Sequence, residues 1–436
     1  MQLITRIRAC NAHVVVDRRI MINKNIVKWI FIILIVLASS PAFGENNDNM
    51  SRFVEGNTAF CFDLYQNLKQ TEGNLFFSPH SISTAIGMVY AGAKGETEKG
   101  IAKTLHFNLD REILFSEFKI IQNRLNSISD AGYLQLLVAN SLWSQKGNHI
   151  LDSFTELNDK YFDSELENVD FINHADNAIL SINTWVRDNT NNKINELLQP
   201  GSVSGLTKII LCNVIYFKGA WESKFNMDNT KPASFYLAPR KQVKVPMMNQ
   251  TGDFKYKDFG KFRAIELPYV TGRKPYRNVN DLSMIILLPE SKRGLSKLEN
   301  ILNQRNISQW VHELMTEPFN PVKVRIPKFT NTLEFELSGI LAEMGMPSVF
   351  CDGADFSGIF GTKDIFINRI FHKTYIDVNE EGTEAAAATE EEFTLGGPTR
   401  KPKIKKFYAD HPFIFFILDN KSGSILFVGR VTDPST

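Results

Sequence analysis

Residues 209–217 read Ile-Ile-Leu-Cys-Asn-Val-Ile-Tyr-Phe, a run that is almost wholly aliphatic, β-branched or aromatic. No alternation leaves one side of the run polar, so it predicts a β-strand that is buried on both faces. The chain can supply a large core, because 43% of its 436 residues are hydrophobic and 33 are Phe. This composition excludes the disordered and fibrous classes of protein.

The order of the predicted elements defines the fold class. Apolar residues recur at helical spacing over 52–68, 81–92 and 111–128, and once more over 333–344. The predicted strands come mostly later, at 134–143, 209–217, 264–267, 282–288, 322–326, 365–378, 413–418 and 424–428. No Gly/Ser-rich or Pro-rich linker interrupts 51–436. Helices first and strands later predict one α+β unit, although length alone would suggest about three domains.

The amino-terminal segment predicts a secretory signal peptide. An intensely apolar run at 29–38 follows Lys24 and Lys28, and small residues come after it. The run is about half as long as a helix that spans a bilayer, and its flanks match a signal peptide that is cleaved near Gly44–Glu45. A retained anchor and a buried helix are the alternatives.

The predicted layout is therefore a leader over 1–44 and a folded domain over 50–434. The protein is expected to be secreted or extracytoplasmic, and periplasmic if its source is bacterial. Met21 would start a signal peptide of ordinary length, which makes 1–20 a wrongly assigned extension in a second interpretation. The four Cys residues have neither the number of a disulfide scaffold nor the spacing of a zinc ribbon.

The sequence contains no catalytic motif. The stretch 201–205 has Val203 where a nucleophile elbow needs serine, and His312 and Glu313 lack the second histidine of a zinc protease. The glycines of 95–100 are not followed by the Lys and Ser or Thr of a phosphate loop. A net charge of +1 is not that of a dedicated nucleic-acid binder. We therefore expect no enzyme activity, no metal and no cofactor.

The stretch 379–406 separates two strong strand predictions and is too long for an ordinary connector. It contains small, acidic, Gly and Pro residues and ends in a basic run at 400–406. Composition alone favours an exposed loop or a short Ala-rich helix.

This stretch and several others resemble the serpin family. The part that is similar to the hinge of an inhibitory serpin is Glu380, Glu381, Gly382, Thr383, Glu384, Ala385, Ala386, Ala387, Ala388 and Thr389. Residues 407–417 resemble the carboxy-terminal signature of the family. Further serpin-like stretches occur in serpin order, at 74–83, 91–97, 213–221, 266–269, 326–329, 354–358 and 427–431.

The resemblance implies a single serpin-fold domain with three β-sheets, eight to nine helices and an exposed reactive-centre loop over about 380–406. It also implies an irreversible suicide-substrate inhibitor of serine proteases, which traps the acyl-enzyme by inserting its cleaved loop into the central sheet. A non-inhibitory serpin that acts as a carrier, a chaperone or a protease substrate is the alternative. The expected protein is a monomer with no nucleic-acid partner and no stable membrane span once mature.

The hinge residues favour inhibition. If the loop inserts as a strand, alternate residues face the core. With Thr383 inward, so are Ala385, Ala387 and Thr389, which are small and uncharged. Glu391 would also point inward, and burying an unpaired carboxylate costs several kcal/mol. We expect Glu391 to slow late insertion unless it reaches solvent or a cation.

The resemblance also assigns two polar groups. The first would hold the central sheet closed before insertion: Ser78, Ser81, Asn213 and His372. The second would lie where the loop enters the sheet, with a Glu–Lys pair tethering the loop base: Trp221, Lys328 and Glu380. Without the resemblance, ordinary hydrogen-bonded core residues would be the preferred interpretation of both groups.

Two counts place the scissile bond differently. Fourteen residues after the hinge residue Gly382 comes Gly396, which gives the bond Gly396–Gly397. Counting back from the carboxy-terminal signature gives a bond near 400–401. We prefer the hinge count, because the inserted length fixes where the protease ends.

The residue before the scissile bond indicates the protease class. Gly396 suits an elastase-like or subtilisin-like enzyme, whereas Phe393 or Leu395 would suit a chymotrypsin-like one. Cleavage after Arg400 would indicate a trypsin-like enzyme, and cysteine proteases are less expected. The basic run 400–406 would suit an acidic partner or a polyanion, although a solvated loop flank is the preferred interpretation.

Overall fold

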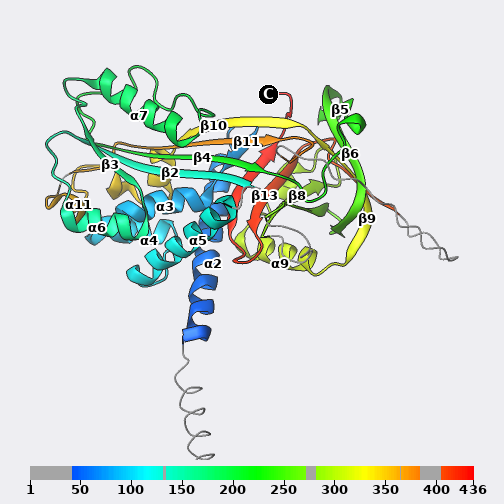
Figure 1. The fold of residues 1–436 in the computed structure, drawn as a ribbon, viewed down its shortest axis with the longest axis horizontal. Coiled ribbons are helices and arrows are strands. Elements are labelled where there is room, and N and C mark those ends of the chain that lie inside the picture. The colour runs from blue at the N-terminus through cyan, green and yellow to red at the C-terminus, as the bar shows by residue number, and fades with distance from the viewer. Residues whose placement is uncertain (1–41, 131–133, 272–280, 364, 383–403) are drawn as a thin grey trace, which may run out of the picture. The chain divides into compact units, whose positions relative to one another are not determined.

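The structure is a computed structural model that describes residues 42–130, 134–271, 281–363, 365–382 and 404–436 (Figure 1). Within it, Asn49–Thr436 forms one compact unit. The predicted apolar core of the signal peptide, the upstream extension and most of the reactive loop lie outside the described residues. In the described part of the chain, no helix is long and apolar enough to cross a bilayer.

The described residues contain ten α-helices and two 3-10 helices. The α-helices are α2 (Ala42–Leu68), α3 (Pro79–Tyr90), α4 (Gly95–Thr104), α5 (Arg111–Asp130), α6 (Asp152–Tyr161), α7 (Ala175–Asn189), α8 (Leu295–Glu299), α9 (Gln304–Met315), α10 (Ser338–Met344) and α11 (Ser357–Phe360). The 3-10 helices are η1 (Met227–Asn229) and η2 (Pro347–Val349). The resemblance implied eight to nine helices, and the short α8 and α11 account for the difference.

The strands of the described chain form two hydrogen-bonded networks. The five-stranded sheet has the order β10 (Phe329–Glu336), β11 (Arg369–Val378), β4 (Ile209–Gly219), β2 (Leu134–Gln145) and β3 (Glu165–Val169). The nine-stranded network has the order β1 (Leu75–Phe77), β14 (Ile425–Val431), β13 (Phe413–Asp419), β8 (Leu282–Pro289), β7 (Phe262–Pro268), β6 (Lys241–Asp258), β9 (Phe319–Pro327) and β12 (Lys405–Tyr408), with β5 (Lys231–Ala238) beside β6.

The long strand β6 explains why three expected sheets are seen as two networks. It has 18 residues and pairs in turn with β5, β9 and β7. Its amino-terminal part belongs with β5, β9 and β12, whereas its last residues join β7 and the strands beyond. One continuous strand therefore links the two smaller sheets.

The buried strand β4 has a core on each side, as its composition predicted. Ile210, Cys212 and Val214 belong to a cluster shared with α7, whereas Leu211 and Ile215 belong to the main core. Helices α3 and α7 lie on opposite faces of the sheet in Figure 1. Side chains alternate along a strand, so Asn213 points to the same side as Leu211 and Ile215, into the main core. A buried amide there needs hydrogen-bond partners.

The predicted helix over 333–344 is wrong in its first part. Residues 333–336 belong to β10, and the helix begins only at Ser338. Phe329 and Asn331 are buried, whereas Thr330 and Thr332, which alternate with them, are exposed. This alternation continues to Glu336, so the period of two is that of a strand with one solvent-facing side.

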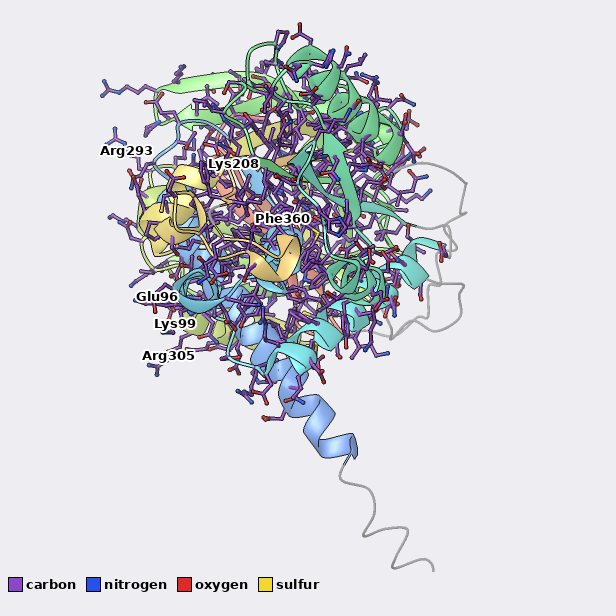
Figure 2. All side chains as sticks on the ribbon, turned by 90° about the vertical axis from the view of Figure 1, so that its left-hand side faces the viewer. Glu96, Lys99, Lys208, Arg293, Arg305 and Phe360 are labelled. Carbon is purple, nitrogen blue, oxygen red and sulfur yellow. The ribbon has the colours of Figure 1, made fainter. Side chains whose placement is uncertain are left out.

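The surface carries charges of both signs, which agrees with the balanced composition. Figure 2 shows Glu96 and Lys99 side by side, and they form an ion pair of 2.8 Å on α4. Both side chains are largely exposed, so this pair contributes little to stability. Arg293 and Arg305 point outward in the same view.

Candidate functional site

Strands β4 and β11 lie side by side in the five-stranded sheet and run parallel. Their register runs from Arg369 opposite Ile210 to Ile376 opposite Phe217. Their outer neighbours β2 and β10 are both antiparallel to them. A strand placed between β4 and β11 could therefore pair antiparallel with both, which makes this ladder the candidate position for an inserted strand.

Asn213 is the centre of a polar cluster on this ladder. Its Nδ2 donates to Ser81 Oγ at 2.5 Å and to Asn140 Oδ1 at 2.5 Å. Its Oδ1 lies 2.5 Å from His372 Nδ1. Asn213 and His372 are register partners, so this last bond joins β4 directly to β11.

Ser78 completes the cluster by connecting it to α3 and β14. Its Oγ accepts from the backbone N–H of Ser81 at 3.1 Å, which caps the amino terminus of α3, and donates to the carbonyl of Leu426 at 2.6 Å. Its backbone N–H lies 3.0 Å from His372 Nε2. The structure thus brings together all four residues that the sequence assigned to the sheet-opening group.

His372 is neutral in this arrangement. Its Nε2 can only accept from the Ser78 N–H, so its Nδ1 carries the proton that bonds to Asn213. Burial lowers the pKa of His372 from 6.5 to about 3. A second proton on Nε2 would point at the Ser78 N–H, so the contact between His372 and Ser78 would break.

Sequence reasoning missed Asn140 and Thr374. Asn140 lies on β2 opposite Asn213, and Thr374 Oγ1 donates to the carbonyl of Phe76 at 2.9 Å. The signal for Asn140 was present in the sequence, because a lone amide within the apolar run 134–143 needs a partner in the core.

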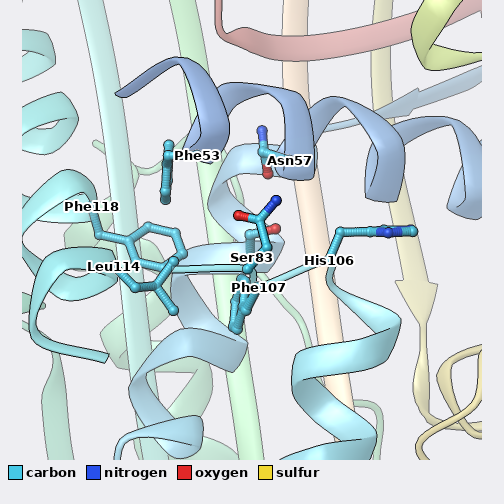
Figure 3. A pocket seen from close by; sticks show the side chains of 8 residues that line it. Phe53, Asn57, Ser83, His106, Phe107, Leu114 and Phe118 are labelled. Atoms are coloured by element: carbon cyan, nitrogen blue, oxygen red, sulfur yellow. The ribbon is translucent and has the colours of Figure 1, made fainter. Parts of the chain in front are cut away.

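A small pocket lies beside α3, on the side of α2 and α5 (Figure 3). It is lined by Phe53, Asn57, Ser83, His106, Phe107, Asn108, Leu114 and Phe118. Neither the amide of Asn57 nor the hydroxyl of Ser83 has a hydrogen-bond partner within the described chain. His80 of α3 is also buried among described residues that offer its ring no hydrogen bond, and burial lowers its pKa to about 4.

Acid should destabilise the folded protein through His80 and His372. Their pKa values are lowered from 6.5 to about 4 and about 3, so below pH 6.5 the unfolded chain binds protons that the folded chain does not. The free energy of unfolding is therefore unaffected above that pH. Below it, each histidine should remove up to about 1.4 kcal/mol per pH unit, until its folded pKa is reached.

Urea unfolding between about pH 7 and pH 4 measures this slope. The variant His80→Phe keeps a ring beside Phe53 and Phe118 and removes one of the two titrations. Its stability should depend on pH about half as steeply. The same slope in the variant and the natural protein would contradict this assignment.

The base of the loop is built around Gly382. After β11 the chain turns at Asn379, whose carbonyl accepts from the Gly382 N–H at 3.1 Å. Gly382 has a φ of +78°, and a Cβ there would lie 2.1 Å from the backbone nitrogen of Trp221. Trp221 holds the turn by donating from its indole to Asn379 O at 2.9 Å and from its backbone to Glu381 O at 3.1 Å. Only glycine fits at position 382.

The predicted Glu–Lys tether is present at the same place. Lys328 Nζ lies 2.9 Å from Glu380 Oε2, with 5% of the Glu380 side chain exposed and 40% of Lys328. Burial, the largest single influence, would raise the pKa of Glu380. The hydrogen bonds from Lys328, the backbone and Thr230, together with the charge of Lys328, outweigh burial, so the pKa is lowered. Trp221, Lys328 and Glu380 therefore meet as expected.

The remaining predicted site residues lie outside the described part of the chain. They are Thr383, Glu384, Ala385, Ala386, Ala387, Ala388, Thr389, Phe393, Leu395, Gly396, Gly397 and Arg400.

In the described chain, a buried polar cluster joins two parallel strands, and the second strand leads into a turn that only glycine fits. The family model for serpins, described as serpin (serine protease inhibitor), matches residues 55–434. The chain belongs to the serpin family, as its sequence motifs predicted.

Individual relatives agree with this assignment. The chain is 38% identical to the leukocyte elastase inhibitor of Sus scrofa, over 88% of this chain and 100% of that protein. It is 37% identical to an uncharacterized serpin-like protein of Methanosarcina acetivorans, over 89% and 90% of the two chains. The crystal structure of uncleaved ovalbumin matches with a TM-score of 0.78 and 29% identity, over 88% of this chain and 100% of that one. The α+β serpin fold is confirmed, and these relatives support a protease inhibitor.

Proposed function

We propose that this chain is an irreversible suicide-substrate inhibitor of a serine protease. The observation that carries the proposal is the β4–β11 ladder, which is closed by the Asn213–His372 bond and leads directly into the hinge at Gly382. A cleaved hinge segment would start at the end of β11 and lie next to the position that it has to occupy.

The protease serine would attack the carbonyl carbon of Gly396. The bond to Gly397 would break, the nitrogen of Gly397 would leave with a proton, and the protease would stay bound to Gly396 as an ester. The freed hinge would then pair between β4 and β11. About fifteen inserted residues at roughly 3.3 Å each would carry the protease about 50 Å, and distortion of its active site would prevent water from releasing it.

The closed sheet would be the less stable state. Insertion replaces one parallel ladder by two antiparallel ladders, and antiparallel pairs are slightly more stable per residue. The inward-facing hinge residues are small and uncharged, so they would add burial without placing a charge in the core: Thr383, Ala385, Ala387 and Thr389. The contacts of Asn213 and of the Glu380–Lys328 tether would delay this change until the loop is cut.

An elastase-like or subtilisin-like enzyme is the preferred target. Gly396 demands little of a specificity pocket, and several relatives are named leukocyte elastase inhibitors. Incubation with a panel of active proteases should give an SDS-resistant complex and release a carboxy-terminal peptide. A peptide that begins at Gly397 in mass spectrometry would support the hinge count, and one that begins at Lys401 would contradict it. Cleavage without any SDS-resistant complex would contradict inhibition itself.

We further propose that 50–434 is the inhibitory domain and that the leader 1–44 directs secretion. The proposal of secretion rests on the leader sequence alone. The pig relative aligns over its whole length with only 88% of this chain, so it provides no support for the leader. Cleavage at Gly44–Glu45 would remove the first three residues of α2. Amino-terminal sequencing of the mature protein should find Glu45 as the first residue. Met1 or Met21 as the first residue would overturn the proposed cleavage.

A further inference from the structure

We propose that the outward face of β9 and β12 docks an acidic surface of the protease that is held at the reactive loop. This proposal rests on the proposed function and names a second contact of the same partner. We call this surface the β9–β12 face, and it consists of Phe319, Lys323, Arg325, Ile404, Lys406 and Tyr408.

The register of the two strands places these side chains together. Lys406 lies opposite Lys323, and Tyr408 lies opposite Arg325, in the parallel ladder between β12 and β9. The intervening Val322, Val324 and Phe407 are buried, so their neighbours point to the other side. The guanidinium of Arg325 lies over the ring of Tyr408 at 4.6 Å, which keeps both side chains on the face.

The cations of this face have no acidic partner in the described chain, unlike their neighbours. Lys257 on the adjacent β6 pairs with Glu313 and Glu317, and Lys255 with Glu266. No described carboxylate forms an ion pair with Lys323, Arg325 or Lys406.

Two lysines directly opposite each other lower the stability of a sheet. Asp253 of β6 lies opposite Pro321, two residues along β9 from Lys323. Such an arrangement is suited to receive negative charge from outside the chain.

Exposed apolar side chains border these cations. Phe319 is 57% exposed and Ile404 is 52% exposed, and Lys255 Nζ lies 5.7 Å from the centre of the Phe319 ring. A polyanion is recognised chiefly through charge, whereas protein interfaces combine apolar anchors with a polar rim. The face therefore fits a protein surface better than a polysaccharide.

A protease at the scissile bond can reach the face. Ile404 is eight residues after Gly396, a stretch that spans at most about 28 Å. A globular domain of about 200 residues has a radius of gyration of about 16 Å. A protease of that size, bound at the scissile bond, therefore extends far enough to contact the β9–β12 face. If Arg400 precedes the scissile bond instead, only about 14 Å has to be covered.

The test uses two proteases that share specificity and differ in surface charge, anionic and cationic trypsin, each with its catalytic serine replaced by alanine. The full serpin chain carries Gly396→Arg, so that both enzymes recognise the loop whichever count is right. Surface plasmon resonance then gives association rates for K323E/K406E. The matched control is K193E/K297E, which reverses two exposed lysines on other parts of the chain.

We expect K323E/K406E to slow association with anionic trypsin by about tenfold at low salt and to speed association with cationic trypsin. The control should change neither rate by more than about twofold. The variant F319S/I404S should speed dissociation and leave the salt dependence unchanged. Misfolding cannot mimic changes of opposite sign.

Equal changes for both trypsins, or changes no larger than those of the control, would overturn the proposal. If K323E/K406E loses heparin binding while its association rates with both trypsins stay unchanged, the face binds a polyanion. That result would also overturn the docking proposal. The inhibitory function is scored separately with active trypsin. Absence of an SDS-resistant complex there would contradict inhibition, while rate changes of opposite sign would still support the docking face.

Discussion

Replacing Thr383 with arginine should convert the inhibitor into a substrate. Thr383 is the first residue of the hinge that would face the core after insertion, and an unpaired guanidinium there costs several kcal/mol. Insertion should then lose the competition with hydrolysis of the acyl-enzyme. We expect the amount of serpin consumed per protease inhibited to rise by more than about tenfold, since 1.4 kcal/mol already changes a rate ratio tenfold.

The measurement is a titration of protease activity with a gel that separates the SDS-resistant complex from cleaved serpin. Glu384→Arg is the matched control, because alternation places position 384 on the opposite side of the inserted strand. It should inhibit nearly as well as the natural chain. Full inhibition by the Thr383→Arg variant would be incompatible with insertion of this segment.

Replacing Asn213 with alanine should strongly destabilise the uncleaved protein. The change leaves His372 Nδ1 and Asn140 Oδ1 buried without the partner that each has now, and removes the donor to Ser81. An unsatisfied buried polar group costs about 1–3 kcal/mol, so we expect these two groups together to cost about 2–6 kcal/mol. Denaturant midpoints of the uncleaved protein measure this loss.

The loop-cleaved form of the same variant provides a second reading. A strand inserted between β4 and β11 separates Asn213 from His372, so the substitution should cost the cleaved form less than the uncleaved one. Asn57→Ala is a suitable control, because Asn57 is buried but has no hydrogen-bond partner within the described chain. Equal losses in the cleaved and uncleaved Asn213→Ala proteins would show that the inserted strand does not part β4 from β11.

The sequence predicted those parts of the fold that depend on local pattern or on family motifs. The strand at 209–217 followed from composition alone, whereas the polar cluster followed only from the resemblance. Asn140 escaped because its role depends on a partner 73 residues away across β2 and β4. The helix over 333–344 failed in its first part because leucines spaced by four fit a helix, while pairing with β11 imposes a period of two.

The direct bond between Asn213 and His372 also has a spectroscopic consequence. Neighbouring strands lie about 4.8 Å apart, so a strand inserted between β4 and β11 would place these two backbones about 9.6 Å apart. A contact of 2.5 Å cannot persist over that distance. The proton on the imidazole nitrogen of His372, which is shielded from exchange in the closed sheet, should therefore give a downfield nuclear magnetic resonance signal that is lost once the sheet opens.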